Sequence, residues 1–333
     1  MQKLILVLGM HRSGTSLVTK ALTTLGVYLG DQLMSPAPDN PKGFFEDIEL
    51  QAINEQFLLS QSCHWDSVRF PSKDTVLSSA LDTYHSTIAQ HLLTRKWPLW
   101  GFKDPRMCRL WPFWETVLST TGQQTKVVWI LRHPFAVARS LARRNQMPWE
   151  MSFLLWRLHN IGAIEGLLNW GGGIVLYEKL LAEPEKTILG MANMLDIGRP
   201  DKNLLRDFAD AFLDYELNHY KGMLAPSTSD HHHHYEDLYQ ILGDDSVSLR
   251  NKLVALQEVP MTEATLVPSL MLMQHERDNI RRNYMELHRA CEDSFKEKDT
   301  AIRELSRLVN DLKNRAFYLE SLILHQRIQP MRR

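Results

Sequence analysis

Short apolar runs alternate with helical patterns along the first half of the chain. The runs are continuous, which is typical of parallel strands covered on both faces. They are Leu4–Leu8, Leu99–Phe102, Val127–Leu131 and Ile174–Tyr177. Between them, apolar residues recur at helical spacing from Leu77 to Leu92, and Pro134 suits the first turn of a helix. Strands that alternate with helices predict an α/β fold with a parallel sheet flanked by helices.

The next part of the chain has a helical character with one interruption. Pro184 is expected to open a helix that Gly198 closes. The segment from Leu224 to Asp245, which includes the run His231–His234, is expected to be a loop because proline, serine and threonine gather in it. The histidine run resembles a metal-binding tract, but we interpret it as a polar loop and expect no metal site there.

Beyond about Met271, charged residues are punctuated by leucine. Apolar positions recur there in alternating steps of three and four residues, which indicates a coiled coil of about five heptads. They include Tyr284, Leu287, Leu305, Leu308 and Leu312. The alternative is one amphipathic helix packed on the globular domain. We therefore expect a first domain over 1–260 and a helical or coiled-coil extension over 261–333 that offers a route to a homodimer.

The composition excludes several classes of protein. The chain has 333 residues, of which 44% are apolar, so it can bury one large core or a core with an appendage. Its net charge of −1 gives no basic field for nucleic acid or an anionic membrane. Its three cysteines are widely spaced, which argues against a disulfide framework or a zinc site. No segment approaches the ~18 uninterrupted apolar residues of a membrane span, and we expect a soluble cytoplasmic protein.

The first apolar run leads into a loop with the character of a phosphate-binding loop. Gly9 and Gly14 have the separation found in G-x-x-x-x-G-K-[ST], and Ser16 fits the last position. Thr15 stands where that motif has lysine, and the main cation of the loop is Arg12. Glycines allow close backbone approach, and a helix N-terminus attracts anions. The loop is therefore built for a phosphate-like group, but not in the manner of an ATPase.

A second anion site is expected after the third apolar run. Arg132 ends that run, and Ser140 follows about two helical turns later. An arginine and a hydroxyl beside the first loop suit a nucleotide that carries phosphates at both its 5′ and 3′ positions. We interpret the nearby Arg139, Arg143 and Arg144 as a solvated helix face.

Three segments resemble one family of enzymes. GMHRSGTSL, WILRHPFAVARSLARR and LYEKLLAEPEKTI are similar to segments of the sulfotransferases that use 3′-phosphoadenosine 5′-phosphosulfate (PAPS). The likeness is greatest to bacterial members and to the Golgi carbohydrate and tyrosylprotein enzymes. It covers about residues 3–225 and implies a P-loop-type sheet. The resemblance also explains why Thr15 replaces the lysine of the phosphate-binding motif, because these enzymes handle no γ-phosphate with its magnesium. It implies that no metal is required.

The resemblance implies roles for the loop residues and for their neighbours. It assigns the 5′-phosphosulfate to the loop residues Arg12, Ser13, Gly14, Thr15 and Ser16. It assigns the 3′-phosphate to Arg132 and Ser140. Tyr177 matches the family's segment near the adenine, and the alternative is that it is a core tyrosine.

Sulfonate transfer needs a base for the acceptor's proton and positive charge for the departing phosphate oxygen. Glu46 in NPKGFFEDIEL is the expected base, because a carboxylate beside aromatic surface can have a raised pKa. In several members of the family a glutamate in this region is the base. The alternative is that Glu46 or Asp47 caps the following helix, and Asp47 is the second candidate for the base.

Further charged residues follow the second apolar run and so face the same edge of the sheet. Lys103 is expected to steady the transferring sulfonate or an anionic acceptor. Asp104 is expected to orient Lys103 or Arg106, or to be the base itself, and a purely structural ion pair is the alternative. We interpret His11 as a hydrogen-bond donor of the loop.

These expectations combine into one function. It is the in-line transfer of a sulfonate from PAPS to a hydroxyl or amine, with Glu46 as base, Arg12 on the leaving phosphate and Lys103 at the sulfonate. The resemblance to carbohydrate-modifying members favours a glycan or glycolipid as the acceptor. The competing hypotheses are a phosphotransferase or NTPase with a degenerate P-loop, and a non-catalytic coiled-coil scaffold.

Overall fold

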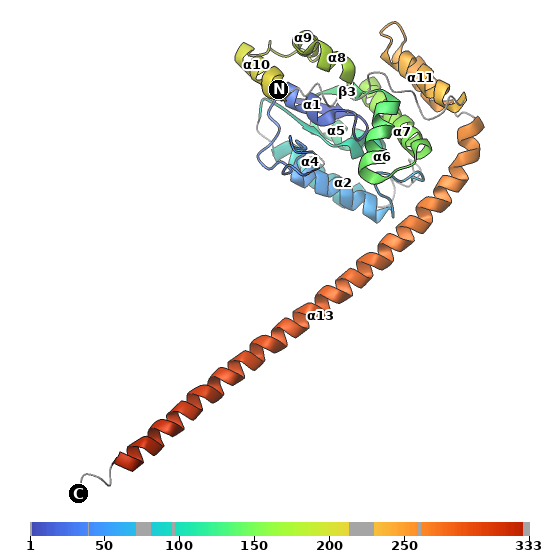
Figure 1. Cartoon of the computed structure of the whole chain (residues 1–333). Helices are drawn as coiled ribbons and strands as arrows, with labels where there is room; N and C mark the ends of the chain where they lie inside the picture. Colours follow the sequence, from blue (N-terminus) through green and yellow to red (C-terminus); the bar gives the residue numbers. More distant parts are fainter. Residues whose placement is uncertain are drawn as a thin grey trace. The chain divides into compact units, whose positions relative to one another are not determined.

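The chain forms two compact units. The computed structural model describes residues 2–38, 40–70, 81–94, 97–212, 230–258 and 261–328 (Figure 1). The units are Met1–Met271 and Leu272–Arg333. The division into functional domains at 260 and 261 stays a prediction. Among the described residues, every helix is too short or too polar to cross a lipid bilayer.

Four parallel strands form the sheet of the first unit. They are β1 (Lys3–Leu8), β2 (Leu99–Lys103), β3 (Gln124–Leu131) and β4 (Gly172–Leu176), in the order β2-β1-β3-β4. Val7 pairs with Lys103 and Leu8 pairs with Trp129, so the strands end at one edge. The predicted strands and the α/β class are confirmed. Some boundaries shift: β3 begins at Gln124 and β4 at Gly172, both earlier than predicted, and Tyr177 begins α8 (Tyr177–Ala182) instead of ending a strand.

Helices cover both faces of the sheet, because alternate residues of a strand point to opposite sides (Figure 1). On β1, Leu4, Leu6 and Leu8 pack into one core, whereas Ile5 and Val7 pack into the other. The first core includes α2 (Ile48–Ser60), α4 (Leu81–Thr94), α5 (Trp111–Thr121), α6 (Pro134–Asn145), α7 (Trp149–Trp170) and α12 (Leu249–Gln257). The second includes α1 (Thr15–Thr23), α8, α9 (Pro184–Met194) and α10 (Lys202–Phe212).

The helix α7 fixes the position of the segment that follows β2. This segment is the short 3-10 helix η1 (Pro105–Cys108). A Cβ atom at Gly162 of α7 would lie 1.8 Å from the carbonyl oxygen of Cys108, so only glycine permits this close packing. Cys63 and Cys108 are free and buried. α6 begins at Pro134, as predicted from the sequence.

Two predictions about helices were wrong. α9 ends at Met194, well before Gly198, because Asp196 adopts a left-handed conformation with φ of 51°. The expected loop is, in its described part, the helix α11 (Asp230–Gly243). Tyr235 and Leu242 of α11 are fully buried. Burial of this apolar face outweighs the local loop signals. Residues 224–229 lie outside the described residues.

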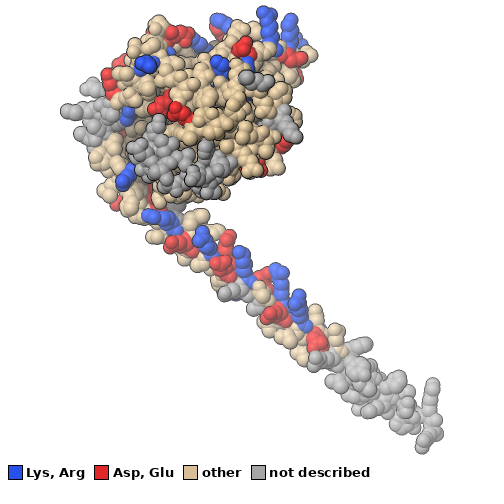
Figure 2. All heavy atoms as spheres, turned by 180° about the vertical axis from the view of Figure 1, so that it is seen from behind, with Lys and Arg blue, Asp and Glu red and all other residues tan. Residues whose placement is uncertain are grey.

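The second unit consists of most of α13 (Met261–Ile328), a helix of 68 residues. The predicted long C-terminal helix is therefore confirmed. Lysine, arginine and acidic residues are interleaved along it (Figure 2). The exposed fractions of Tyr284, Leu287, Leu305, Leu308 and Leu312 lie between 59% and 65%. The coiled coil itself stays a prediction.

Candidate active site

The loop between β1 and α1 has the backbone geometry of an anion site. Arg12 and Gly14 both have positive φ, at 68° and 88°, and α1 begins directly afterwards at Thr15. The backbone N–H groups of Gly14, Thr15 and Ser16 have no acceptor within the described ranges. A left-handed turn followed by the unpaired N–H groups of a helix start binds anions. The geometry of the loop therefore agrees with the predicted anion site and does not test it.

Tyr177 and Arg132 are stacked against this loop. A Cβ atom on Gly14 would lie 2.3 Å from Cδ2 of Tyr177, so the ring packs directly on the glycine. The guanidinium of Arg132 lies over the same ring, 4.2 Å from its centroid. Tyr177 thus supports both the loop and the arginine, and its expected contact with an adenine stays a prediction.

Arg132 and Ser140 meet at Arg12. Nη1 of Arg132 donates to the carbonyl oxygen of Arg12 at 2.9 Å, and Nε of Arg12 donates to Oγ of Ser140 at 2.8 Å. Trp156 of α7 donates from Nε1 to the carbonyl oxygen of Arg132 at 3.0 Å. The structure therefore brings the three predicted residues together, with Ser140 linked through Arg12. Nε of Arg132 is buried and has no partner among the described residues.

The loop is joined to the segment that carries Glu46. Oγ of Ser16 donates to the carbonyl oxygen of Phe44 at 3.2 Å and accepts from Nδ2 of Asn40 at 3.3 Å. Phe45 has φ of 56°, which is rare for a bulky side chain. Such conformations cluster at functional sites, where the surrounding contacts hold them. Ser16 thus connects the candidate anion site to the candidate base.

The carboxylate of Glu46 is buried between two cations. Its Oε1 lies 2.5 Å from Nζ of Lys103, and its Oε2 lies 3.4 Å from Nη1 of Arg106. Burial raises the pKa of Glu46, against the lowering effect of Lys103. A carboxylate with a raised pKa is a better proton acceptor at neutral pH than an ordinary one. The geometry therefore agrees with the role expected for Glu46 and does not test that role.

Asp47 caps α2. Its Oδ1 accepts hydrogen bonds from the backbone N–H groups of Glu49 and Leu50, both at 3.1 Å. Glu49 also contacts Nδ1 of His91 at 3.0 Å. Asp47, Glu49 and His91 each place a metal-ligand atom within 4.8 Å of the others. The helix cap and the contact with His91 account for this grouping. Of the two neighbouring carboxylates, it is Glu46 that contacts Lys103 and Arg106 in the described part of the chain.

Asp104 orients Arg106. Its Oδ1 accepts from the backbone nitrogen of Arg106 at 2.9 Å and from Nη1 at 3.0 Å. Its Oδ2 accepts from Nδ2 of Asn54 at 2.9 Å, and Asn54 in turn accepts from Nε1 of Trp114. Nε of Arg106 donates to Glu55 at 2.9 Å. Both oxygens of Asp104 are engaged, which favours the orienting role over that of the base.

Sequence reasoning missed Asn54 and Glu55, because no motif marks them. The only signal is their place on the helix that was expected after Glu46. It also missed the role of Glu178, which accepts from the backbone nitrogen of His133 at 3.2 Å and from the hydroxyl of Tyr239 at 2.8 Å. These bonds anchor α11 to the segment after β3.

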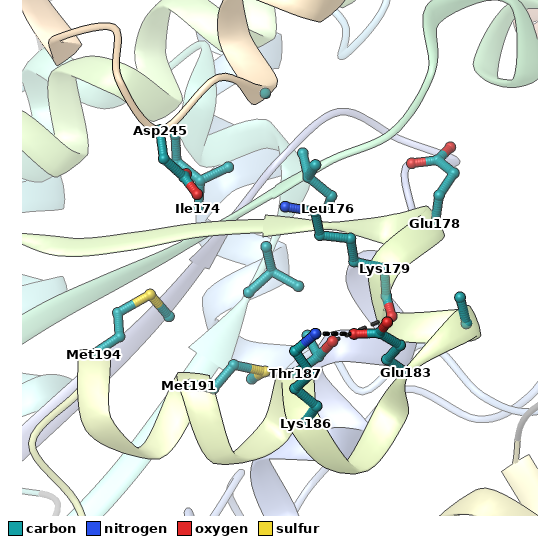
Figure 3. A pocket seen from close by; sticks show the side chains of 14 residues that line it. Ile174, Leu176, Glu178, Lys179, Glu183, Lys186, Thr187, Met191, Met194 and Asp245 are labelled. Atoms are coloured by element: carbon teal, nitrogen blue, oxygen red, sulfur yellow. Dashed lines mark hydrogen bonds and ion pairs between the residues drawn. The ribbon is translucent and has the colours of Figure 1, made fainter.

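A cavity of about 600 Å³ lies beside β4 and α9 (Figure 3). Ile174, Leu176, Met191 and Met194 give it an apolar lining, and an ion pair of 2.6 Å joins Lys186 to Glu183. None of the expected catalytic or nucleotide-binding residues lines this cavity. The candidate active site is thus defined by its polar groups at the strand ends and not by this hollow.

The comparisons with known proteins give distant likenesses of fold. No protein-family model matches the chain, and no curated protein matches its sequence. The chain is similar to the sulfotransferase domain from the Synechococcus PCC 7002 olefin synthase, with 16% identity, a TM-score of 0.44, and coverage of 73% of this chain and 95% of that one. It is also similar to the sulfotransferase domain from the curacin biosynthetic pathway, with 14% identity, a TM-score of 0.48, and coverage of 72% and 98%.

A third match is retinol dehydratase in complex with androsterone and the inactive cofactor PAP. Its identity is 14%, its TM-score is 0.29, and the match covers 80% of this chain and 78% of that one. With TM-scores below 0.5, these likenesses are distant, and the function proposed below rests on the geometry of the site itself.

Proposed function

We propose that the chain is a PAPS-dependent sulfotransferase. The observation that supports this most is the joint placement of Arg12, Ser140 and Arg132 beside a glycine loop. This loop has Thr15 where the motif G-x-x-x-x-G-K-[ST] has lysine. The loop provides one anion position, and Arg132 with Ser140 provides a second beside it. Two neighbouring anion positions fit a nucleotide that carries phosphates at its 5′ and 3′ ends.

The donor site would use backbone N–H groups that have no acceptor among the described residues. The N–H groups of Gly14, Thr15 and Ser16, with Arg12, would hold the 5′-phosphosulfate. Arg132 and Ser140 would hold the 3′-phosphate, and the buried Nε of Arg132, which has no partner in the described part of the chain, fits this role. PAPS supplies a sulfonate that is already bonded to a phosphate leaving group, and the proposed reaction requires no metal.

The chemistry would take place at Glu46. A bond forms between the acceptor oxygen and sulfur as the bond from sulfur to the phosphate oxygen breaks, and Glu46 accepts the proton of the acceptor hydroxyl. Lys103 and Arg106 hold the carboxylate of Glu46 in place. Once Glu46 is protonated, Lys103 is free to offset the charge on the transferring group, while Arg12 offsets the charge on the leaving phosphate.

A glycan or glycolipid is the proposed acceptor. Trp65 is half-buried and lies against His11 of the loop, with ring centroids 4.3 Å apart. An aromatic face beside the reacting groups is the surface on which an apolar face of a sugar packs. The alternative is an acceptor that receives the sulfonate on an amine instead of a hydroxyl.

We also propose that α13 forms a homodimer with a second copy of the chain, and that the protein acts in the cytoplasm. The exposed apolar positions of α13 support the first proposal, and the free, buried Cys63 and Cys108 support the second. Light scattering should give about twice the chain mass of 38.7 kDa. Leu308→Glu, at one of the exposed apolar positions of α13, should reduce the measured mass to that of one chain, whereas Ser306→Glu should leave the mass unchanged.

Calorimetry tests the nucleotide site. We expect the full chain to bind adenosine 3′,5′-bisphosphate and not ATP with magnesium, because Thr15 replaces the lysine that an ATPase places on the γ-phosphate. Binding of ATP alone would contradict the proposal and favour a phosphotransferase. Binding of neither nucleotide would favour a non-catalytic scaffold.

A further inference from the structure

His11 carries a polar group that nothing in the described part of the protein uses. Its Nε2 is buried and makes no hydrogen bond within the described ranges. The ring is held by two others: Trp65 at a centroid distance of 4.3 Å, and the edge of His159 at 5.9 Å. A buried polar atom without a partner is rare and costly, so a group from outside the chain is its expected partner.

The environment of His11 keeps its imidazole neutral. Burial lowers the pKa of His11 well below its ordinary value, and the charges of Arg106, Lys103 and Arg144 and the neighbouring His159 lower it further. The backbone N–H of Gly9, in the same loop, donates to Sγ of Cys108 at 3.2 Å, so the loop lies beside the segment that carries Arg106. A neutral imidazole has one nitrogen that donates and one that accepts, whereas a cationic imidazole only donates. The ring thus matches a hydroxyl, which also donates and accepts.

We propose that His11 Nε2 binds the acceptor hydroxyl, and that the acceptor lies against Trp65. This inference rests on the proposed sulfotransferase function and adds the residue that receives the acceptor. His11 holds the hydroxyl, and Glu46 takes its proton. Trp65 and the loop hold the imidazole in place, so the hydroxyl meets a group that is already oriented.

The test of the role of His11 uses water as the simplest hydroxyl acceptor. The full chain is given PAPS labelled with sulfur-35, and the release of sulfate is measured for the wild type, His11→Phe and His11→Gln. Phenylalanine keeps the ring shape without a nitrogen, whereas glutamine places an amide group near the position of Nε2. We expect His11→Phe to lower the rate roughly tenfold, the effect of about one hydrogen bond. His11→Gln should stay within about threefold of the wild type.

Two controls separate the failure of this inference from the failure of the proposed function. Both variants should bind adenosine 3′,5′-bisphosphate as the wild type does and should unfold at the same urea concentration. If the wild type does not bind the bisphosphate, the proposed function fails and this inference fails with it. If it binds, equal rates for the two variants would overturn the role of His11 alone. Bisphosphate binding without any release of sulfate would overturn it as well.

Discussion

The two sides of the candidate site treat their cations differently. On the loop side, Arg132 contacts only neutral groups among the described residues: a carbonyl oxygen and the ring of Tyr177. On the other side, Lys103 and Arg106 contact carboxylates at 2.5 to 3.4 Å. A cation beside neutral groups keeps its charge available to a ligand. A cation paired with a carboxylate mainly holds that carboxylate in place.

This difference indicates a division of labour. In the proposed function the loop side binds an anion, because its N–H groups and Arg132 have hydrogen-bonding capacity left among the described residues. The carboxylate side is arranged to orient Glu46, because Lys103, Arg106 and the Asn54–Asp104 pair surround it. Substitutions on the two sides should therefore affect different measurements: nucleotide affinity on one side and turnover on the other.

The largest expected effect is on the carboxylate side. Glu46→Gln should lower turnover by a factor of about 10² to 10⁴, because it removes the proton acceptor. The affinity for adenosine 3′,5′-bisphosphate should stay within about twofold. Asp47→Asn is the matched control, because asparagine can still cap α2 through its side-chain oxygen. Turnover that survives in Glu46→Gln but not in Asp47→Asn would reassign the base.

On the loop side, Arg132→Met should weaken the binding of the bisphosphate about a hundredfold, since a charged hydrogen bond to a phosphate contributes about 1.5 to 3 kcal/mol. Arg143→Met is the control. It makes the same change in charge on the exposed end of α6. Calorimetry on both variants measures the difference. Equal losses would show that only the overall charge matters and that Arg132 is not a specific ligand.

A smaller effect is expected at the base of the loop. Gly14→Ala should destabilise the fold by about 2 to 4 kcal/mol and weaken bisphosphate binding, because the new methyl group meets Tyr177 and φ is 88°. Gly26→Ala is a matched control: φ is 78°, but a Cβ there has nothing within 4 Å. It should cost about 1 to 2 kcal/mol. Urea unfolding compares the two, and equal costs would show that the Tyr177 contact contributes nothing.

The sequence predicts the fold and the loop side of the site well. Continuous apolar runs identify the four strands, and parallel strands bring everything that follows them to one edge. Arg12, Arg132 and Ser140 could therefore be grouped without a structure, and they do meet. Their roles as ligands of a nucleotide stay predictions.

The carboxylate side could be predicted only in part, for a physical reason. A carboxylate that caps a helix and one that faces a lysine look alike in a sequence, so Glu46 and Asp47 could not be told apart. Asn54 and the pairing of His11 with Trp65 depend on how the helices pack. The helix α11 was missed because its stability comes from the burial of Tyr235 and Leu242, which local loop signals do not report.

The smallest expected effect concerns His159, which is fully buried behind His11. Burial lowers the pKa of His159 to about 3, so the folded protein keeps it neutral while the unfolded chain takes up a proton below about pH 6.5. Its contribution to stability is therefore complete above pH 6.5 and is lost as the pH falls. The loss is at most about 1.4 kcal/mol per pH unit.

Urea unfolding followed by tryptophan fluorescence measures this slope, because all nine tryptophans lie between residues 65 and 170. His159→Met should lower the stability at pH 7, since the bond from Nδ1 to the carbonyl oxygen of Leu155 is lost. It should also flatten the pH dependence between pH 5 and 6.5, because methionine does not titrate. His288→Gln, which replaces an exposed histidine of α13, should leave the slope unchanged. An unchanged slope in His159→Met would mean that other titratable groups carry the acid sensitivity.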